Sequence, residues 1–145
     1  MTEKFRNISR ERDDLIFNPK KINLPYSICI LKPQVCVNQE SCQEIIKVLE
    51  ENELEIRSVL QRELTIQECQ NLYYQHEGKD YYNKLIVNNS TGESLVMLIS
   101  SSKYHPVERL KQLMGPKDPE KGKEEEPESL RAKYGEDLIN NAIYR

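Results

Sequence analysis

Three short segments, each either apolar throughout or alternating, most constrain what this chain of 145 residues can fold into. Residues 26–31 and 95–99 are apolar runs of a length typical of buried strands, whereas residues 54–64 alternate as a half-buried strand does. The first run ends at Lys32-Pro33, and proline cannot continue a strand ladder. The sequence therefore predicts at least three strands, the first of which ends beside Lys32.

Helical patterns lie between these strands. Residues 41–44 have the form of a capping box, and apolar residues follow at helical spacing up to Leu49. A second capping-box pattern, at residues 65–68, precedes a helical stripe that consists of Cys69, Leu72, Tyr73 and His76. Gly78 interrupts this stripe, and residues 80–86 are expected to form a second short helix.

Turn signals and charge mark the remaining elements. Residues 88–93 carry turn chemistry, and His105-Pro106 is expected to open a helix that Gly115-Pro116 closes. Residues 116–128 contain three lysines and six acidic residues, so we expect a solvated loop there. Residues 130–134 are expected to form a helical turn.

This order of elements predicts an α+β domain with helices on one face of a mostly antiparallel sheet. A fourth strand can come only from the residues after Leu138. The chain is long enough for one domain with a core, at residues 25–145. Residues 1–24 are expected to be a flexible charged leader. Alternatively, they form an arm whose apolar patch Leu15-Ile16-Phe17 docks on a partner or on the domain itself.

Composition excludes several classes of protein. The formal net charge is -3, and no block of Lys and Arg is large enough for a general nucleic-acid face. No apolar run approaches a signal peptide or the roughly 18 residues of a membrane span. We therefore expect a cytoplasmic protein that binds neither nucleic acid nor membrane.

The four cysteines do not indicate a metal site. Cys29, Cys36, Cys42 and Cys69 contain no C-x-x-C pair and no matching histidine spacing, so we expect no zinc site and no bound metal. In a reducing compartment they are expected to be free thiols in or near the core.

Several motifs, in order, resemble those of nucleoside diphosphate kinases, from about Tyr26 to Tyr144. The matching segments are Ile28–Pro33 (followed by Gln34 where aspartate is usual), Glu44–Lys47, Leu113–Pro119, Pro127–Gly135 and the frame Asn141–Ile143. The segment Pro127–Gly135 is similar to one characteristic of the divergent, often multidomain, branch of this family found in cilia and flagella.

The resemblance implies a ferredoxin-like βαββαβ fold, here truncated at the last strand. It also implies that the first helix begins somewhat before Ser41. Members of the family move a γ-phosphate from a nucleoside triphosphate to a diphosphate through a phosphohistidine. The unfinished sheet edge would be a template for a partner strand.

The resemblance also implies a nucleotide site. Lys32 matches the lysine beside the transferred phosphate, and Tyr73 the tyrosine near the catalytic imidazole. Tyr81 stands where the family has a phenylalanine that stacks on the base. Leu85 matches the apolar residue at the other edge of the base. The remaining matches are Lys111 for an arginine, Lys117 for a phosphate-binding threonine, Arg131 for a phosphate-binding arginine, and Leu138 and Asn141 for contacts to base and sugar.

Core packing is the alternative explanation for part of this set. Tyr73, Tyr81 and Leu85 sit at helical spacings where packing alone would account for them. Packing explains Lys32 and Arg131 less well, although a lysine can snorkel, so these two favour a retained anionic site.

Tyr144 occupies the position of the histidine nucleophile in this resemblance. A phenol, with a pKa of about 10, is almost wholly protonated at neutral pH, and its phosphate ester is too stable to act as a carrier. His76 and His105 lie in helical contexts remote in motif order, and we do not expect them to substitute. We therefore predict no catalytic residue and no nucleoside diphosphate kinase activity.

Two hypotheses of function follow. The first is a non-catalytic interaction module with protein partners, in a ciliary or flagellar axonemal assembly as the divergent branch suggests. The second is a sensor that binds ATP, GTP or a diphosphate, with magnesium, without turnover. An active kinase is a third hypothesis, and none of the three requires a resident cofactor.

Overall fold

The computed structural model of the chain describes residues 24–138 and 140–144. The predicted leader therefore lies, up to residue 23, outside the described residues, as does Arg145. The described chain forms a four-stranded sheet in the order β2-β3-β1-β4, and every neighbouring pair is antiparallel. The strands are β1 (Tyr26–Leu31), β2 (Glu55–Glu63), β3 (Glu93–Ser100) and β4 (Ile143–Tyr144).

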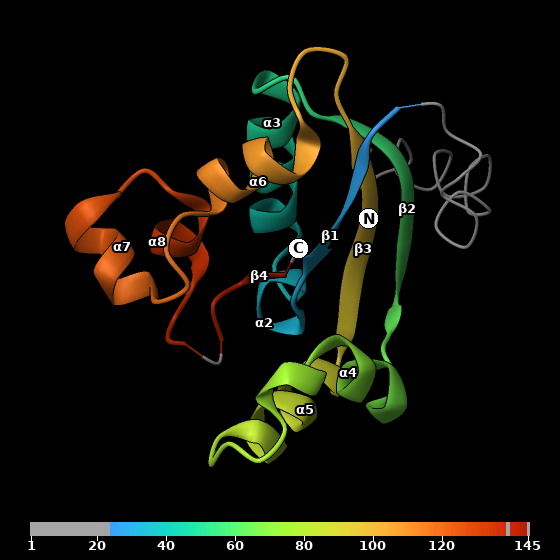
Figure 1. Ribbon diagram of the computed structural model, residues 1–145, viewed down its shortest axis with the longest axis vertical. Coiled ribbons are helices and arrows are strands. Elements are labelled where there is room, and N and C mark those ends of the chain that lie inside the picture. The colour runs from blue at the N-terminus through green and yellow to red at the C-terminus, as the bar shows by residue number, and fades with distance from the viewer. Residues whose placement is uncertain (1–23, 139, 145) are drawn as a thin grey trace.

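The helices cover one face of the sheet and one of its ends (Figure 1). They are α2 (Pro33–Cys36), α3 (Gln39–Glu51), α4 (Ile66–Leu72), α5 (Tyr82–Ser90), α6 (Pro106–Met114), α7 (Pro119–Glu125) and α8 (Leu130–Tyr134), with a 3-10 turn, η2, at Tyr74–His76. Figure 1 shows α3 and α6 in front of the sheet, and α4 and α5 together beyond one end of β2 and β3. We call this α4–η2–α5 segment, residues 66–90, the lobe.

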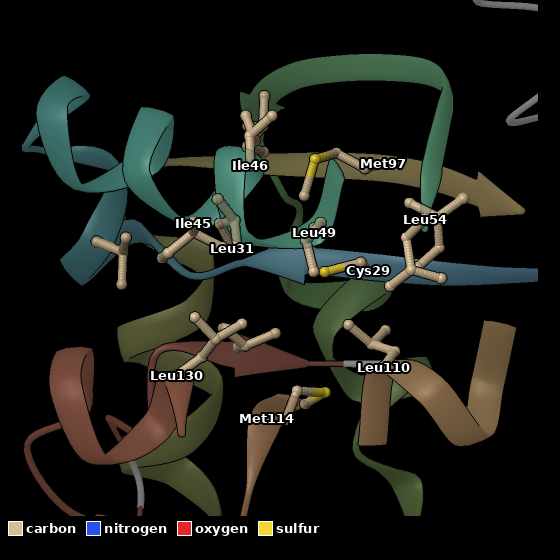
Figure 2. Close-up of a cluster of buried hydrophobic side chains, with 14 of the residues drawn as sticks. Cys29, Leu31, Ile45, Ile46, Leu49, Leu54, Met97, Leu110, Met114 and Leu130 are labelled. Carbon is tan, nitrogen blue, oxygen red and sulfur yellow. The ribbon is translucent and has the colours of Figure 1, made fainter. Parts of the chain in front are cut away.

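The main hydrophobic core lies between the sheet and helices α3 and α6 (Figure 2). Side chains from β1 and β3 meet side chains from the two helices there, and the largest fully buried ones include Leu31, Leu49, Met97 and Leu110. Alternation along β3 sends Val96 to a second cluster, which also holds residues of the lobe such as Tyr73 and Leu85. The two faces of the sheet therefore have different linings.

The predicted α+β, ferredoxin-like arrangement is confirmed. The strands lie in the order β4-β1-β3-β2, and α3 and α6 make the two crossover connections. The fourth strand follows Leu138 as predicted, and two of its residues are described. The capping box at Thr65 is also confirmed, because Thr65 Oγ1 accepts from the Glu68 amide (3.1 Å) and the Glu68 carboxylate accepts from the Thr65 amide (2.9 Å).

The pattern at residues 41–44 does not cap the helix, and the earlier start that the resemblance implied is confirmed. Helix α3 begins at Gln39, and its N-cap is Asn38, whose Oδ1 accepts hydrogen bonds from the amides of Glu40 (3.0 Å) and Ser41 (3.3 Å). An earlier side chain thus satisfies the free amides of the first turn, and the Ser41 pattern lies inside the helix.

The boundaries predicted around the lobe also need correction. The stripe from Cys69 to His76 is not one helix, because α4 ends at Leu72 and a 3-10 turn follows. The next helix, expected at residues 80–86, runs over residues 82–90, so the first half of the predicted 88–93 turn is helical. The turn is reduced to Thr91 and Gly92, where Gly92 has a φ of 89°.

Residues 116–128 are not the solvated loop that their charge predicted. Helix α7 occupies Pro119–Glu125, with proline at its first position and Asp118 Oδ1 accepting from the Glu120 amide at 3.0 Å. Gly122 is buried, and a Cβ there would lie 3.4 Å from the Cβ of Ala132 on α8. Close packing of α7 on α8 therefore stabilises a helix whose other side is charged and exposed.

Two further predictions concern α6 and the cysteines. Helix α6 opens at Pro106 and is closed by Gly115, whose φ of 77° favours glycine, as predicted. The four cysteines are free thiols, with Cys29 and Cys69 buried and the other two partly buried, which is also as predicted. Within the described ranges, none of the helices has the length and apolar character needed to cross a membrane.

Candidate functional site

Tyr73 is the centre of a group of side chains at the end of the sheet that faces the lobe. Its ring is buried, with 6% of its surface exposed. The ring centroid of Tyr144 lies 5.2 Å away and that of His76 6.1 Å away, both in edge-to-face geometry. The ammonium nitrogen of Lys32 lies 5.4 Å from the Tyr73 centroid. We call these four residues the Tyr73 cluster.

Backbone bonds fix Lys32 between three elements. It directly follows β1, and its amide donates to the Ala142 carbonyl (2.8 Å) just before β4. Its carbonyl accepts from the amides of Val35 (2.9 Å) and Cys36 (3.1 Å), which begins helix α2. The strand end predicted at Lys32-Pro33 is thus confirmed, and it holds this lysine in the interior with 4% of its surface exposed.

Tyr144 is held by both its ring and its hydroxyl. It lies on β4 opposite Ile30, and its ring packs on the second hydrophobic cluster. Its hydroxyl donates, at 3.2 Å, to the carbonyl of Leu72, which is the last residue of α4. This side chain therefore ties the last strand to the lobe.

Positive charge dominates the electrostatics of the cluster. Burial and, to a lesser extent, the charge of Arg131 together lower the pKa of Lys32 to about 7, although Asp137 partly opposes them. Burial also lowers the pKa of His76, as do the charges of Lys117, Lys32 and Lys79. The site thus gathers cations from β1, the lobe, the α6–α7 connection and α8.

Arg131 is engaged with the backbone. Its two terminal nitrogens donate to the carbonyls of Gly115 (3.1 Å) and Ile143 (3.2 Å). The guanidinium of α8 therefore joins the end of α6 to β4. This contact uses the planar donor fork that is also suited to binding phosphate.

Asn141 and Lys117 form a second connection near β4. The amide nitrogen of Asn141 donates to the Lys117 carbonyl at 3.1 Å. Among the described residues, the buried Oδ1 of Asn141 has no donor. A buried acceptor of this kind suits a hydroxyl donor from a ligand, such as a sugar hydroxyl. The side chain of Lys117 is exposed.

Tyr81 and Leu85 have different environments. Tyr81 lies at the start of α5, is partly exposed, and its hydroxyl lies 2.6 Å from His76 Nδ1. Leu85 is buried in the second cluster with Tyr73, as the packing alternative predicts. Tyr81 thus remains accessible to a planar ligand, whereas Leu85 is a core residue.

The structure brings together Lys32, Tyr73, Arg131 and Tyr144, and links Tyr81 to them through His76. Lys111, in the last turn of α6, and Leu138 are exposed side chains.

Sequence reasoning missed His76 and Lys79. His76 is remote in motif order, but its ring contacts both Tyr73 and Tyr81. Both residues fall between two predicted site residues, Tyr73 and Tyr81, and this spacing could have indicated them. His105, in contrast, is the exposed N-cap residue of α6.

Metal-ligating side chains do not gather here. Within residues 24–138 and 140–144, no three His, Cys, Asp or Glu side chains are placed to hold a metal ion.

Comparison with known proteins identifies the family. A family model described as nucleoside diphosphate kinase matches residues 26–145. The chain belongs to the nucleoside diphosphate kinase family. This confirms the resemblance stated from the motifs, and it covers every element from β1 to β4.

Relatives of this nucleoside diphosphate kinase domain include longer proteins. Thioredoxin domain-containing protein 3 of Mus musculus is 35% identical over 118 residues, which cover 81% of this chain and 20% of the relative. Nucleoside diphosphate kinase homolog 5 of Mus musculus is 30% identical over 124 residues, which cover 86% of this chain and 56% of the relative. The chain thus spans about a fifth of the first relative and just over half of the second.

Solved structures agree on the fold. The structure of Aquifex aeolicus nucleoside diphosphate kinase matches with a TM-score of 0.75 at 21% identity. The match covers 83% of this chain and 84% of the Aquifex chain. The enzyme of Halobacterium salinarum, in complex with CDP, has a TM-score of 0.69 at 23% identity, with coverages of 84% and 76%. At these identities the likeness establishes the fold alone.

Proposed function

We propose that this nucleoside diphosphate kinase domain does not transfer phosphate and serves as a structural or docking module. The observation that carries the proposal is the environment of Tyr144. Its hydroxyl donates to the Leu72 carbonyl, and its ring lies against Tyr73. A side chain used in this way connects β4 to the lobe, and it stands at the position that the motif comparison assigns to the nucleophile.

The chemistry of the side chain supports the same proposal. Ping-pong transfer needs a nucleophile that accepts a phosphate and returns it to a second acceptor. A phenol is protonated at neutral pH and forms a stable ester, so it cannot do both. The expected result is that no γ-phosphate passes from ATP to a nucleoside diphosphate.

Two other residues of the candidate nucleotide site support a structural role. Arg131 donates to two backbone carbonyls, and the amide of Asn141 donates to a third. These bonds join α8, the α6–α7 connection and β4. In this proposal, the residues matched to the nucleotide site contribute to holding the last strand in place.

The lobe is the surface that we propose for docking. It exposes several large apolar side chains, which are Ile66, Tyr74, Tyr81 and Val87. Exposed apolar groups gathered on one segment are typical of protein interaction sites. In the relatives that match, a segment like this chain is one part of a longer protein, which fits a module. The proposed partners are proteins of a ciliary or flagellar axoneme, and the proposed location is cytoplasmic, within that assembly.

Co-sedimentation with axonemal fractions tests the docking proposal. The purified chain is expected to sediment with them, and the double variant Ile66→Ser/Val87→Ser is expected to stay in the supernatant. Val37→Ser is the matched control, because Val37 is an exposed apolar residue of the α2–α3 turn. The proposal is wrong if the wild type remains soluble beside these fractions, or if the lobe variant and the control sediment equally.

A second candidate, nucleotide binding without turnover, is favoured by the unpartnered acceptor Asn141 Oδ1 and by the cations around His76. The gathered charges of Lys32, Lys79 and Lys117 would attract a polyphosphate. The partly exposed ring of Tyr81 could stack on a base. These features are independent of any nucleophile.

A thermal-shift titration with magnesium ADP or ATP tests this candidate. Ligand at about 100 times its Kd should stabilise the fold by roughly 2.7 kcal/mol. Lys117→Gln should weaken the shift, and Lys47→Gln, an exposed lysine of α3, should leave it unchanged. The absence of a shift at millimolar nucleotide would remove the candidate while leaving the docking proposal standing.

A further inference from the structure

The thiols of Cys36 and Cys42 meet where α2 turns into α3. Cys36 is the last residue of α2, and Cys42 lies in the first turn and a half of α3. The sulfur of Cys36 lies 3.3 Å from the Leu31 carbonyl oxygen, and that of Cys42 lies 3.8 Å from the Val35 carbonyl oxygen. Because the Val35 carbonyl directly precedes Cys36, the second of these distances places the Cys42 sulfur beside the backbone of Cys36. Two free cysteines thus approach within a short segment of chain.

The turn between the helices explains this approach. Val37 and Asn38 reverse the chain, and Val37 points outward with 85% of its surface exposed. Asn38 caps α3, and its carbonyl accepts from the Cys42 amide at 3.3 Å. Both cysteines therefore lie on the inner side of the turn, where each packs against the main core.

The pair differs from the other two cysteines in access and in acidity. Cys29 and Cys69 are fully buried, whereas Cys36 and Cys42 are partly exposed. The interaction between the two thiols raises the pKa of Cys36 and lowers that of Cys42. Thiolate is the reactive form, so Cys42 is the better nucleophile of the two.

We propose that Cys36 and Cys42 are an oxidation site that closes into an intramolecular disulfide when the chain meets a small disulfide oxidant. The Cys42 thiolate attacks one sulfur of a disulfide such as oxidised glutathione and releases one glutathione thiolate. Cys36 then loses its proton and attacks the Cys42 sulfur of this mixed disulfide, releasing the second glutathione thiolate. The two protein thiols lose two electrons and two protons, and two molecules of reduced glutathione carry them away.

The link would act on the segment that begins at Lys32. The Cys36 amide donates to the Lys32 carbonyl, so a Cys36–Cys42 bond would fasten the backbone after Lys32 to α3. The chemistry of the pair depends on neither docking nor nucleotide binding. Failure of either proposed function would leave this site untouched.

Peptide mapping of the folded chain tests the proposal. The protein is treated with oxidised glutathione, its remaining thiols are alkylated, and it is unfolded and digested with a protease that cleaves after glutamate. Cleavage after Glu40 separates Cys36 from Cys42, which lies in the short peptide Ser41–Glu44. The two peptides are expected to remain joined until a reductant is added. Recovery of both cysteines as alkylated thiols would overturn the proposal.

Variants assign the roles of the two thiols. Cys36→Ser should trap glutathione on Cys42, because the second attack is lost, and Cys42→Ser should leave Cys36 largely unmodified. Cys29 shares the Cys36 peptide, so Cys29→Ala should keep the link, and fragment spectra of the wild-type peptide give the same assignment without a variant. A link through Cys29, or a stable mixed disulfide in the wild type, would contradict the proposal.

Discussion

The two hydrophobic clusters of this domain differ in what they contain. The main core, between the sheet and helices α3 and α6, consists of aliphatic and sulfur-containing side chains such as Leu49 and Met97, with no exposed surface. The second cluster includes the phenols of Tyr73 and Tyr144, and it lies beside the buried ammonium of Lys32. The first region is built as a core alone, whereas the second combines packing with an ionisable group.

This difference separates the residues that specify the fold from those that correspond to the family's site. Apolar packing is sufficient to specify the sheet and its two crossover helices. A buried cation such as Lys32 costs stability, and a domain that retains it pays a penalty that packing alone does not require. The second cluster is therefore the region that holds an ionisable group which packing of the fold does not require.

The largest expected effect is a cavity in the main core. Leu49→Ala should destabilise the domain by about 2–5 kcal/mol, because it removes a fully buried side chain of α3 from contact with the sheet. Denaturant unfolding measures this loss. Val37→Ala, at an exposed position, should change stability by less than about 0.5 kcal/mol. Equal effects of the two changes would break the distinction between core and surface here.

Replacing the buried cation should have the opposite sign. The pKa of Lys32 is about 7 in the folded chain and 10.5 ordinarily, so between these values only the unfolded chain binds the proton. Stability therefore rises as pH increases from about 7 to 10.5. Each unit of pKa difference between the folded and unfolded states corresponds to about 1.4 kcal/mol. At pH 6–7, Lys32→Met should therefore be more stable than wild type by on the order of a few kcal/mol.

Unfolding at several pH values checks this expectation. The advantage of Lys32→Met should shrink as pH rises from about 7 to 10.5, because only above 10.5 is the wild-type lysine neutral in both states. A variant that is less stable than wild type across the whole range would show that the contacts of the Lys32 cation with its neighbours outweigh its burial.

A smaller effect is expected at Tyr144. Tyr144→Phe keeps the ring on Tyr73 but removes the hydrogen bond to the Leu72 carbonyl, so it should cost about 0.5–1.5 kcal/mol. Thermal or denaturant unfolding measures the change. Tyr74→Phe is the control, since Tyr74 is an exposed residue of the lobe. No loss in the Tyr144 variant would remove the structural role of its hydroxyl.

The smallest effect is expected at the Arg62–Glu68 pair, beside the capping box of α4. The hydrogen bond from Arg62 lowers the pKa of Glu68 to about 2, so its stabilisation is present above about pH 4.5 and is lost as pH falls through 2. Both side chains are more than a third exposed, so Glu68→Gln should cost only about 0.5–1 kcal/mol at pH 6. The difference from wild type should vanish near pH 2, and a constant difference would exclude the ion pair as its cause.

Most of the fold could be predicted because it depends on local patterns. Apolar runs gave β1 and β3, and the Thr65 pattern gave the start of α4. Helix α7 could not be predicted from its charge, since it depends on the contact of Gly122 with Ala132 on another helix. Asp118-Pro119 is a helix start signal, but the charged composition of residues 116–128 favoured a loop.

The site could be predicted only in part. The motifs indicated Lys32, Tyr73 and Tyr144, and the structure places these together. The hydrogen bonds of Arg131 to backbone carbonyls could not be predicted from spacing along the chain. Their acceptors, the carbonyls of Gly115 and Ile143, come from segments that are distant in sequence.

A phosphoryl-transfer assay tests the central claim most directly. Purified protein is incubated with ATP labelled on the γ-phosphate and with GDP, and labelled GTP and labelled protein are both measured. We expect neither labelled GTP nor labelled protein above the background level, and the same result for Tyr144→Phe. Formation of GTP by the wild type that is lost in Tyr144→Phe would contradict the central claim.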